Sequence, residues 1–224
     1  MVNHMDFNQA MQFVSNLDLH LIELIERFGA GAYFILFLII FLETGAVVMT
    51  VLPGDSLLVG AGAFAATKDL NLAVLLIGFY LATVLGDTLN FHWGQFFGRK
   101  YHHSRFEEKT LLKFINKENF EKVNRFFTSN GRKAFLFSRF IPIARSLMPF
   151  TAGFTQVDFS TLFPFMLIGN ALWSGLYVLL GFFVGNMSFF QDKFHYLMIV
   201  IFLISMIPTS VYLLRSKRSA DSKE

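Results

Sequence analysis

The stretch AFLFSRFIPIARSLMPFTAGFTQV, residues 134–157, decides how this chain folds, because it is mostly apolar yet contains two arginines and two prolines. Proline removes a helical hydrogen bond and disfavours helix at the residue before it, so one straight helix through Pro142 is not expected. Residues 43–66, ETGAVVMTVLPGDSLLVGAGAFAA, form a second tract of the same kind, with Pro53 near its middle. We therefore predict two broken helical hairpins.

The composition of the 224 residues places these hairpins in a membrane. Hydrophobic residues make up 54% of the chain and charged residues 16%, against about 25% charged in a soluble domain. The mean hydropathy is +0.51. These values exclude a soluble globular enzyme and a disordered or fibrous chain. The absence of cysteine excludes a disulfide framework and thiolate chemistry, and we expect neither a metal nor a cofactor.

The remaining apolar tracts predict about four transmembrane helices. A crossing needs about 20 residues, and a broken segment is tolerated at membrane depth only where protein buries it or it lines a polar cavity. The expected spans are 29–42 extended backward by 21–28, then 70–98, 159–191 and 194–214. We thus expect an all-α integral membrane protein with two re-entrant hairpins at about 43–66 and 134–157.

The ends of the chain complete the predicted domain organisation. Residues 1–28 have apolar side chains at helical spacing, which predicts an N-terminal amphipathic segment; the alternative is that they form the first turns of the first span. A cleavable signal peptide is not expected, because a basic n-region and a cleavage pattern are missing. Residues 29–191 form the membrane domain, and 192–224 hold the last transmembrane helix and a basic tail.

Basic residues predict the orientation. Ten Lys and Arg residues lie in the loop 99–133, and four more follow residue 214, so both segments are expected on the cytoplasmic side. Within the loop, apolar residues at helical spacing over 120–127 predict an amphipathic surface helix. The net charge of +3 is explained by this topology, so nucleic acid is not an expected partner.

A weak internal repeat agrees with that topology. An even number of crossings between loop and tail makes the two hairpins enter from opposite faces. The first hairpin ends in AGAF (61–64) and the second in AGF (152–154), and GQFFG (94–98) resembles GFFVG (181–185). Small residues four apart also serve plain helix packing. We predict an inverted repeat, an arrangement with which many transporters build a substrate site from broken helices.

Four charges lie within the predicted hairpins: Glu43, Asp55, Arg139 and Arg145. Each charge costs about 2.5–3.5 kcal/mol at the bilayer centre, so pairing across the hairpins is expected. Two purely structural ion pairs are one interpretation. In the other, the arginines bind an anionic head group, because their rigid fork of donors matches phosphate oxygens, and Glu43 or Asp55 carries a proton.

A fifth ionisable residue, Asp87, interrupts the tract 70–98. Asn90 and His92 follow closely. A polar stripe that faces the helix bundle is the favoured interpretation, and a catalytic Asp and His pair is the alternative.

These motifs together resemble the DedA family of membrane proteins, bacterial relatives of the SNARE-associated Golgi or VTT-domain proteins, and are most similar to the bacterial branch. The matching segments are FLETG (41–45), LPGDS (52–56), Gly86-Asp87 with Gly94 and Gly98, RFIPIAR (139–145), Ala152-Gly153 and 170–173. Ala171 stands where relatives often have glycine. The resemblance implies that Glu43, Asp55, Arg139 and Arg145 are required for activity. The other positions it marks are hairpin-shaping (Gly45, Pro53, Gly54, Pro142, Gly153) or accessory polar residues (Asp87, Asn170, Trp173).

The resemblance also implies transport linked to the proton motive force and translocation of lipid head groups, such as recycling of undecaprenyl phosphate. We therefore expect a multi-pass transporter of the bacterial plasma membrane, not an enzyme, with an anionic lipid phosphate and protons as partners. The alternatives are a proton-coupled exporter of small cations and a non-transporting assembly factor for membrane proteins. The sequence leaves open whether the chain forms a homo-oligomer.

Overall fold

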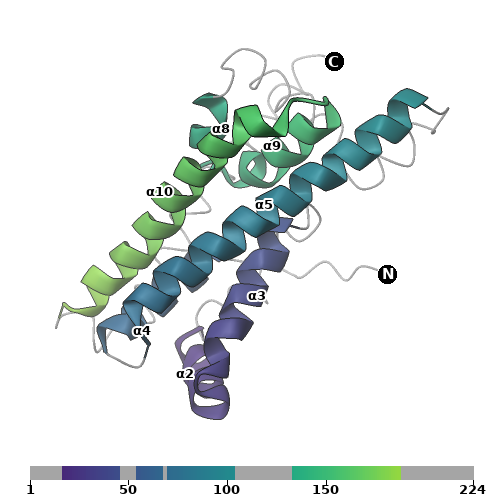
Figure 1. Cartoon of the computed structure of the whole chain (residues 1–224). Helices are drawn as coiled ribbons and strands as arrows, with labels where there is room; N and C mark the ends of the chain where they lie inside the picture. Colours follow the sequence, from purple (N-terminus) through teal and green to yellow (C-terminus); the bar gives the residue numbers. More distant parts are fainter. Residues whose placement is uncertain (1–16, 46–53, 68–69, 104–132, 188–224) are drawn as a thin grey trace, which may run out of the picture. The chain divides into compact units, whose positions relative to one another are not determined.

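The computed structural model describes residues 17–45, 54–67, 70–103 and 133–187. Within these ranges the chain forms helices and no strand, which confirms the all-α fold for the described residues. Figure 1 follows the helices in chain order. They are α2 (Leu17–Phe28), α3 (Gly31–Gly45), α4 (Gly54–Ala66), α5 (Leu72–His103), α8 (Lys133–Ser138), α9 (Pro142–Phe154) and α10 (Phe159–Gly185).

Two helices, α5 and α10, are long and apolar enough to cross a bilayer. They contain 32 and 27 residues, which at 1.5 Å per residue gives about 48 Å and 40 Å against a hydrocarbon core of about 30 Å. These helices match the spans predicted at 70–98 and 159–191. The span predicted at 194–214 lies outside the described residues.

Both long helices expose a stripe of large apolar side chains. On α5 the exposed residues recur every three or four positions: Val74, Ile77, Leu81, Leu85, Leu89, Trp93 and Phe96. On α10 they are Ile168, Leu172, Leu176, Leu179, Leu180, Phe183 and Met187, the last just beyond the helix end. Contiguous apolar stripes of this size are rare on soluble proteins and are suited to contact with lipid tails.

Short polar side chains define where the long helices begin. The Asn71 side chain accepts hydrogen bonds from the backbone N–H groups of Ala73 (3.0 Å) and Val74 (3.2 Å) ahead of α5. Ahead of α10, the Asp158 carboxylate accepts hydrogen bonds from the hydroxyls of Ser160 (2.6 Å) and Thr161 (3.2 Å). These hydroxyls, Ser160 first, hold the pKa of Asp158 below its usual range. The Asn71 bonds satisfy backbone donors that the first turn of α5 cannot pair within the helix.

The sequence left open whether the N-terminal residues form a separate amphipathic segment or the first turns of the first span. The structure contains two separate helices here, α2 and α3. Gly29 has a φ of +52° and separates α2 from α3, so residues 17–28 form a helix of their own. Residues 1–16 of the predicted amphipathic segment lie outside the described residues. The 15 residues of α3 span about 22 Å, less than the bilayer core, so the number of crossings stays a prediction.

Of the two tracts predicted to be broken, the second is interrupted within the described residues. In the second, α8 ends at Ser138 and α9 begins at Pro142, where proline suits the first helical turn. In the first, α3 ends at Gly45 and α4 begins at Gly54, and the residues between lie outside the described part. That the tracts re-enter the membrane, and from opposite faces, stays a prediction.

Contacts divide the chain into two compact units. Unit 1 contains residues 1–36, 53–77 and 176–224; unit 2 contains residues 37–52 and 78–175.

In unit 1, α4 is almost completely enclosed. It packs against α2, and eleven of its thirteen residues are buried. α4 also contacts the C-terminal part of α10. Gly62 lies so close to it that a Cβ would be within 3.0 Å of the Val178 carbonyl oxygen. Gly181 on α10 meets the Val59 carbonyl oxygen in the same way, and Gly185 meets Ala63. These glycines let the two backbones touch.

Unit 2 contains the same contact between α9 and α5. Gly153 on α9 meets the Phe91 carbonyl oxygen of α5, while Gly94 and Gly98 on α5 meet the carbonyl oxygens of Phe150 and Phe154. Every partner on the short helix is shifted by 91 residues from its counterpart in unit 1, and every partner on the long helix by 87. The constant shifts support the internal repeat that the sequence predicted.

A hydrophobic core in unit 2 fixes α9 in place. It is built around residues from α5, α8, α9 and α10: Phe91, Phe135, Ala144, Leu147, Met148, Phe150, Ala152, Leu162 and Met166. Apolar packing therefore holds α8 and α9 against α5 and α10 in unit 2.

Candidate functional site

Three of the four hairpin charges lie in unit 2. Glu43 is near the end of α3, Arg139 lies in the turn between α8 and α9, and Arg145 is in the first turn of α9. Asp55, the second residue of α4, belongs to unit 1. One short segment around the break at Pro142 therefore carries both arginines.

Arg145 forms an ion pair with Glu43. Its Nη2 lies 2.5 Å from the Glu43 Oε1, and the two side chains are 11% and 4% exposed. The guanidinium also lies over the ring of Trp173 from α10, with Cζ 5.3 Å from the ring centroid. A cation over an aromatic face is stabilised by the ring quadrupole. Pairing between the two tracts, which the sequence predicted, is confirmed for these two residues.

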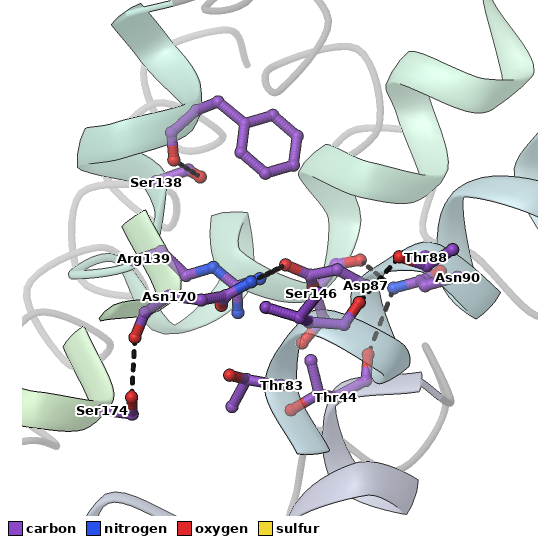
Figure 2. Close-up of polar contacts among 12 residues, drawn as sticks. Thr44, Thr83, Asp87, Thr88, Asn90, Ser138, Arg139, Ser146, Asn170 and Ser174 are labelled. Carbon is purple, nitrogen blue, oxygen red and sulfur yellow. Dashed lines mark hydrogen bonds and ion pairs between the residues drawn. The ribbon is translucent and has the colours of Figure 1, made fainter. Parts of the chain in front are cut away.

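Arg139 is paired with Asp87, a residue outside both tracts. The sequence led us to expect the hairpin acids as the partners of the hairpin arginines, so the Asp87 pairing corrects that expectation. Both side chains are buried, and Asn170 on α10 donates a hydrogen bond of 2.9 Å from its Nδ2 to the Asp87 Oδ2. Figure 2 shows the Asn170 amide pointing at this carboxylate beside Arg139. Asp87 comes from the middle of α5, and the sequence had marked it as an accessory polar residue without indicating Arg139 as its partner.

The interpretation of Asp87 as part of a buried polar stripe is confirmed. Thr83, Asp87 and Asn90 follow each other at helical spacing on α5, and all three are fully buried. His92, the alternative partner, is exposed, and its Nδ1 lies 2.7 Å from the Thr88 carbonyl oxygen. The described contacts of His92 are thus with its own helix and with aromatic rings.

Asn90 ties three helices of unit 2 together. Its Nδ2 donates to the Ser146 carbonyl oxygen of α9 (2.7 Å) and to the Thr44 carbonyl oxygen of α3 (3.4 Å). Figure 2 shows both interactions. Both acceptors sit next to a charged residue in the chain, since Thr44 follows Glu43 and Ser146 follows Arg145. Asn90 thereby fixes the backbone that carries the Glu43 and Arg145 pair.

Several buried oxygen atoms of unit 2 have no hydrogen-bond donor among the described residues. They are Asp87 Oδ1, Asn90 Oδ1, Asn170 Oδ1 and Thr151 Oγ1. Buried acceptors in native proteins normally have partners. The unit therefore has acceptor capacity that a proton or a donor group can use.

The residues marked as hairpin-shaping lie where backbones meet or helices begin. Gly45 ends α3, and a Cβ there would touch the Gly86 backbone at 3.5 Å. Gly86 in turn has no room for a Cβ, which would lie 2.8 Å from the Thr44 Cβ. Gly54 and Pro142 begin α4 and α9, and Gly153 contacts α5. Pro53 lies outside the described residues. The sequence had included Gly86 in a matching motif without a role.

The described residues contain no group of three or more His, Asp or Glu side chains arranged to hold a metal ion. The polar chemistry of unit 2 is that of arginine, carboxylate and amide groups in an apolar helical frame.

Comparisons with known proteins agree on one family. The model of the VTT domain matches residues 52–183. Protein DedA of Escherichia coli (strain K12) is 35% identical over 212 residues, which are 94% of each chain. A membrane protein of Mycobacterium leprae is 28% identical over 173 residues, 77% of this chain and 75% of the relative. Inner membrane protein YqjA of E. coli (strain K12) is 27% identical over 175 residues, 78% of this chain and 77% of the relative.

No solved structure matches the chain. The family model alone covers more than half of the chain, and the E. coli DedA match extends over nearly all of it. Together with the two long apolar helices, these matches show that the chain belongs to the DedA family of membrane proteins, which carry the VTT domain.

Proposed function

We propose that the chain is a transporter that moves a lipid phosphate between the leaflets of the bacterial plasma membrane, coupled to the proton motive force. Undecaprenyl phosphate is the lipid that the family resemblance implies. Arg139 and Arg145 bind the phosphate head group, and Glu43 and Asp55 take up and release protons. The chain is proposed as a carrier and not as an enzyme.

The observation that supports this proposal best is that Arg139 and Arg145 are each paired with one acidic side chain, Asp87 and Glu43 respectively. A phosphate oxygen offers an arginine the same charge-assisted hydrogen bonds as a carboxylate oxygen. A head group can therefore replace a carboxylate at either guanidinium without leaving an arginine unpaired in an apolar surrounding. Unpaired buried charges would be prohibitive, so exchange between two anions is the favourable way to bind.

Arg145 is the better candidate for first contact with the head group. It keeps 11% of its side chain exposed, whereas the whole of Arg139 is 2% exposed. The Trp173 ring holds the Arg145 guanidinium by its face. Such a contact leaves the donor edge of the guanidinium available to an anion.

The proposal is tested in liposomes that contain a polyprenyl phosphate, by measuring its movement between leaflets with and without a pH gradient. Wild type is compared with Glu43→Gln, Arg145→Lys and the control Arg99→Lys. Arg99 is an exposed arginine of α5 whose Nη2 donates to Gln95 on the same helix. We expect gradient-sensitive movement in wild type and in the control, and its loss in the two site variants.

Lysine at position 145 keeps the charge but loses the planar fork, so an unchanged rate in Arg145→Lys would contradict phosphate binding by this residue. Folded wild type that moves no lipid, beside a control flippase that works, would overturn the proposal. A pH-driven cation flux in the same liposomes would then favour the exporter of small cations. Absence of both activities would favour the assembly factor.

The orientation is a separate part of the proposal. We propose that the loop 99–133 and the C-terminal tail face the cytoplasm. Because the sequence contains no cysteine, a single cysteine can be placed in each segment, at Ser104→Cys and Ser216→Cys. We expect a membrane-impermeant thiol reagent to label neither in intact spheroplasts and both in inverted vesicles. Labelling of either site in intact spheroplasts would refute the orientation.

A further inference from the structure

We propose that Asp87 is a further proton-carrying residue of the transport cycle. Asp87 pairs with Arg139 while the site is empty, and it takes up a proton when Arg139 turns to the phosphate. This inference rests on the proposed function, and it names a residue outside both broken tracts. In this cycle Arg139 exchanges one anionic partner for another, and the proton keeps the abandoned carboxylate neutral.

The surroundings of Asp87 fit such an exchange. The residue is fully buried in the middle of α5, and its described charged contact is Arg139. Its second described partner is the neutral amide of Asn170, which donates 2.9 Å to Oδ2. Its Oδ1 accepts no hydrogen bond from the described residues. Arg139 is therefore the group that makes a charged carboxylate tolerable at this place.

The consequence of moving Arg139 follows from this environment. When the guanidinium turns to a phosphate, Asp87 remains a buried carboxylate with one neutral amide as its described donor. Burial strongly disfavours an ionised carboxylate, so Asp87 binds a proton at a carboxylate oxygen. The proton comes from the aqueous side to which the loaded site is open. It is released when the phosphate leaves and Arg139 returns to the carboxylate, so one proton is taken up and one released in each cycle.

Among the described residues of unit 2, the charged groups that bear on this pair are Arg145 on α9 and, through Arg145, Glu43 on α3. Arg145 acts on Arg139 through charge repulsion, and Glu43 neutralises Arg145. From α10 the facing groups are Asn170 and Ser174, which do not titrate. The two ion pairs thus differ. The Glu43 and Arg145 pair is partly accessible and backed by Trp173, whereas the Asp87 and Arg139 pair is closed.

The test measures proton uptake on ligand binding. Purified protein in weakly buffered detergent solution is titrated with farnesyl phosphate, with farnesol as the uncharged control ligand, while a pH-indicator dye reports protons. Binding to arginine also favours the doubly charged phosphate, which releases protons. The contribution of Asp87 is therefore the difference between wild type and Asp87→Asn at equal occupancy.

We expect wild type to take up close to one proton more per bound farnesyl phosphate than Asp87→Asn does. The variant should also bind the ligand more tightly, on the order of tenfold, because an amide competes for Arg139 less strongly than a carboxylate. Its rate of lipid movement should fall, since the head group is no longer displaced from Arg139. Equal proton uptake in the two proteins would overturn the role of Asp87.

A milder variant guards against misfolding of Asp87→Asn. Asn170→Leu keeps the volume of the side chain and removes the amide that stabilises the charged Asp87, so the pH at which proton uptake is half-maximal should rise. The matched control is Asn186→Leu, the same substitution at an asparagine just after α10 whose amide donates to the Phe182 carbonyl oxygen, away from the site. It should leave that pH where it is in wild type. The same pH in Asn170→Leu as in wild type would count against the proposal.

Failure of the proposed function is distinguishable from failure of this inference. Wild type that neither binds farnesyl phosphate nor moves lipid phosphate overturns both. Wild type that binds and moves the lipid, with a proton count that Asp87→Asn and Asn170→Leu leave unchanged, overturns the role of Asp87 alone.

Discussion

Replacement of Gly153 by alanine tests the close contact between α9 and α5. A Cβ at Gly153 would lie 2.9 Å from the Gln95 backbone N and 3.0 Å from the Phe91 carbonyl carbon, and closer still to the Phe91 oxygen. Ordinary contact begins at 3.4 Å, so the Gln95 contact alone needs a shift of about 0.5 Å, and the nearer Phe91 oxygen needs a larger one. The obstructing atoms belong to a helix backbone, which no change of rotamer removes.

Overpacking of this kind costs about 1–3 kcal/mol, and an obstacle made of backbone places Gly153→Ala in the upper part of that range. Alanine returns about 0.5–1 kcal/mol because it stabilises the helix itself. We expect a net loss of about 1–2 kcal/mol, which corresponds to a melting temperature lower by about 2–8 °C for a chain of this size.

Gly175→Ala is the matched control, because Gly175 lies inside α10 and a Cβ added there would meet no atom within 4 Å. It gains the helix propensity without the collision, so its melting temperature should rise by a few degrees. The assay is thermal unfolding of the purified proteins in one detergent, followed by tryptophan fluorescence and by the folded fraction in size-exclusion chromatography. If Gly153→Ala melts at or above the temperature of Gly175→Ala, the close contact does not exist.

Three further predictions concern other residues. Asn90→Leu should lower the free energy of unfolding by about 1–3 kcal/mol in chemical denaturation, because the buried Ser146 carbonyl loses its donor; an unchanged value would mean that this tie is not formed. Because the pKa of Asp158 is lowered in the folded protein, the ionised carboxylate stabilises the fold at pH values above the ordinary pKa of 3.8. This contribution disappears as the pH falls through the lower folded-state pKa. Asp158→Asn should therefore melt at a lower temperature than wild type at neutral pH, and the gap should close in acid; a gap that does not change with pH would refute this. Trp173→Leu should weaken farnesyl phosphate binding about two- to fivefold by removing the ring beneath Arg145, while Trp173→Phe retains most of the affinity; equal loss in both variants would exclude a role for the aromatic face.

The sequence was sufficient to predict the helical class, the two long helices and the break at Pro142. These features follow from local rules, since apolar length and the missing proline N–H act within a few residues. The glycine repeat was also visible in the sequence. The partners of these glycines were not, because nothing in the AGF motif indicates which long helix it touches.

The partner of Arg139 was beyond prediction for a related reason. Asp87 and Arg139 are far apart in the chain, and Asp55 offered the same charge within a tract that matched the motif better. The choice between two carboxylates depends on how α5 and the turn after α8 are placed in space. The spacing of Thr83, Asp87 and Asn90 was a usable signal, since it puts three polar residues on one face of an apolar helix.

The glycine contacts have a consequence for the order in which the protein is assembled. Synthesis runs from the N-terminus, so α5 already exists when the ribosome produces α9, and their contact can close at once. The contact between α4 and α10 cannot form at once, because Val178 and Gly181 follow Gly62 by more than 100 residues. Two contacts of equal geometry therefore form at different times. Until α10 has been inserted, the face of α4 that carries Gly62 lacks the α10 backbone against which it packs. A chain that stops before Val178 therefore cannot complete the contact of α4.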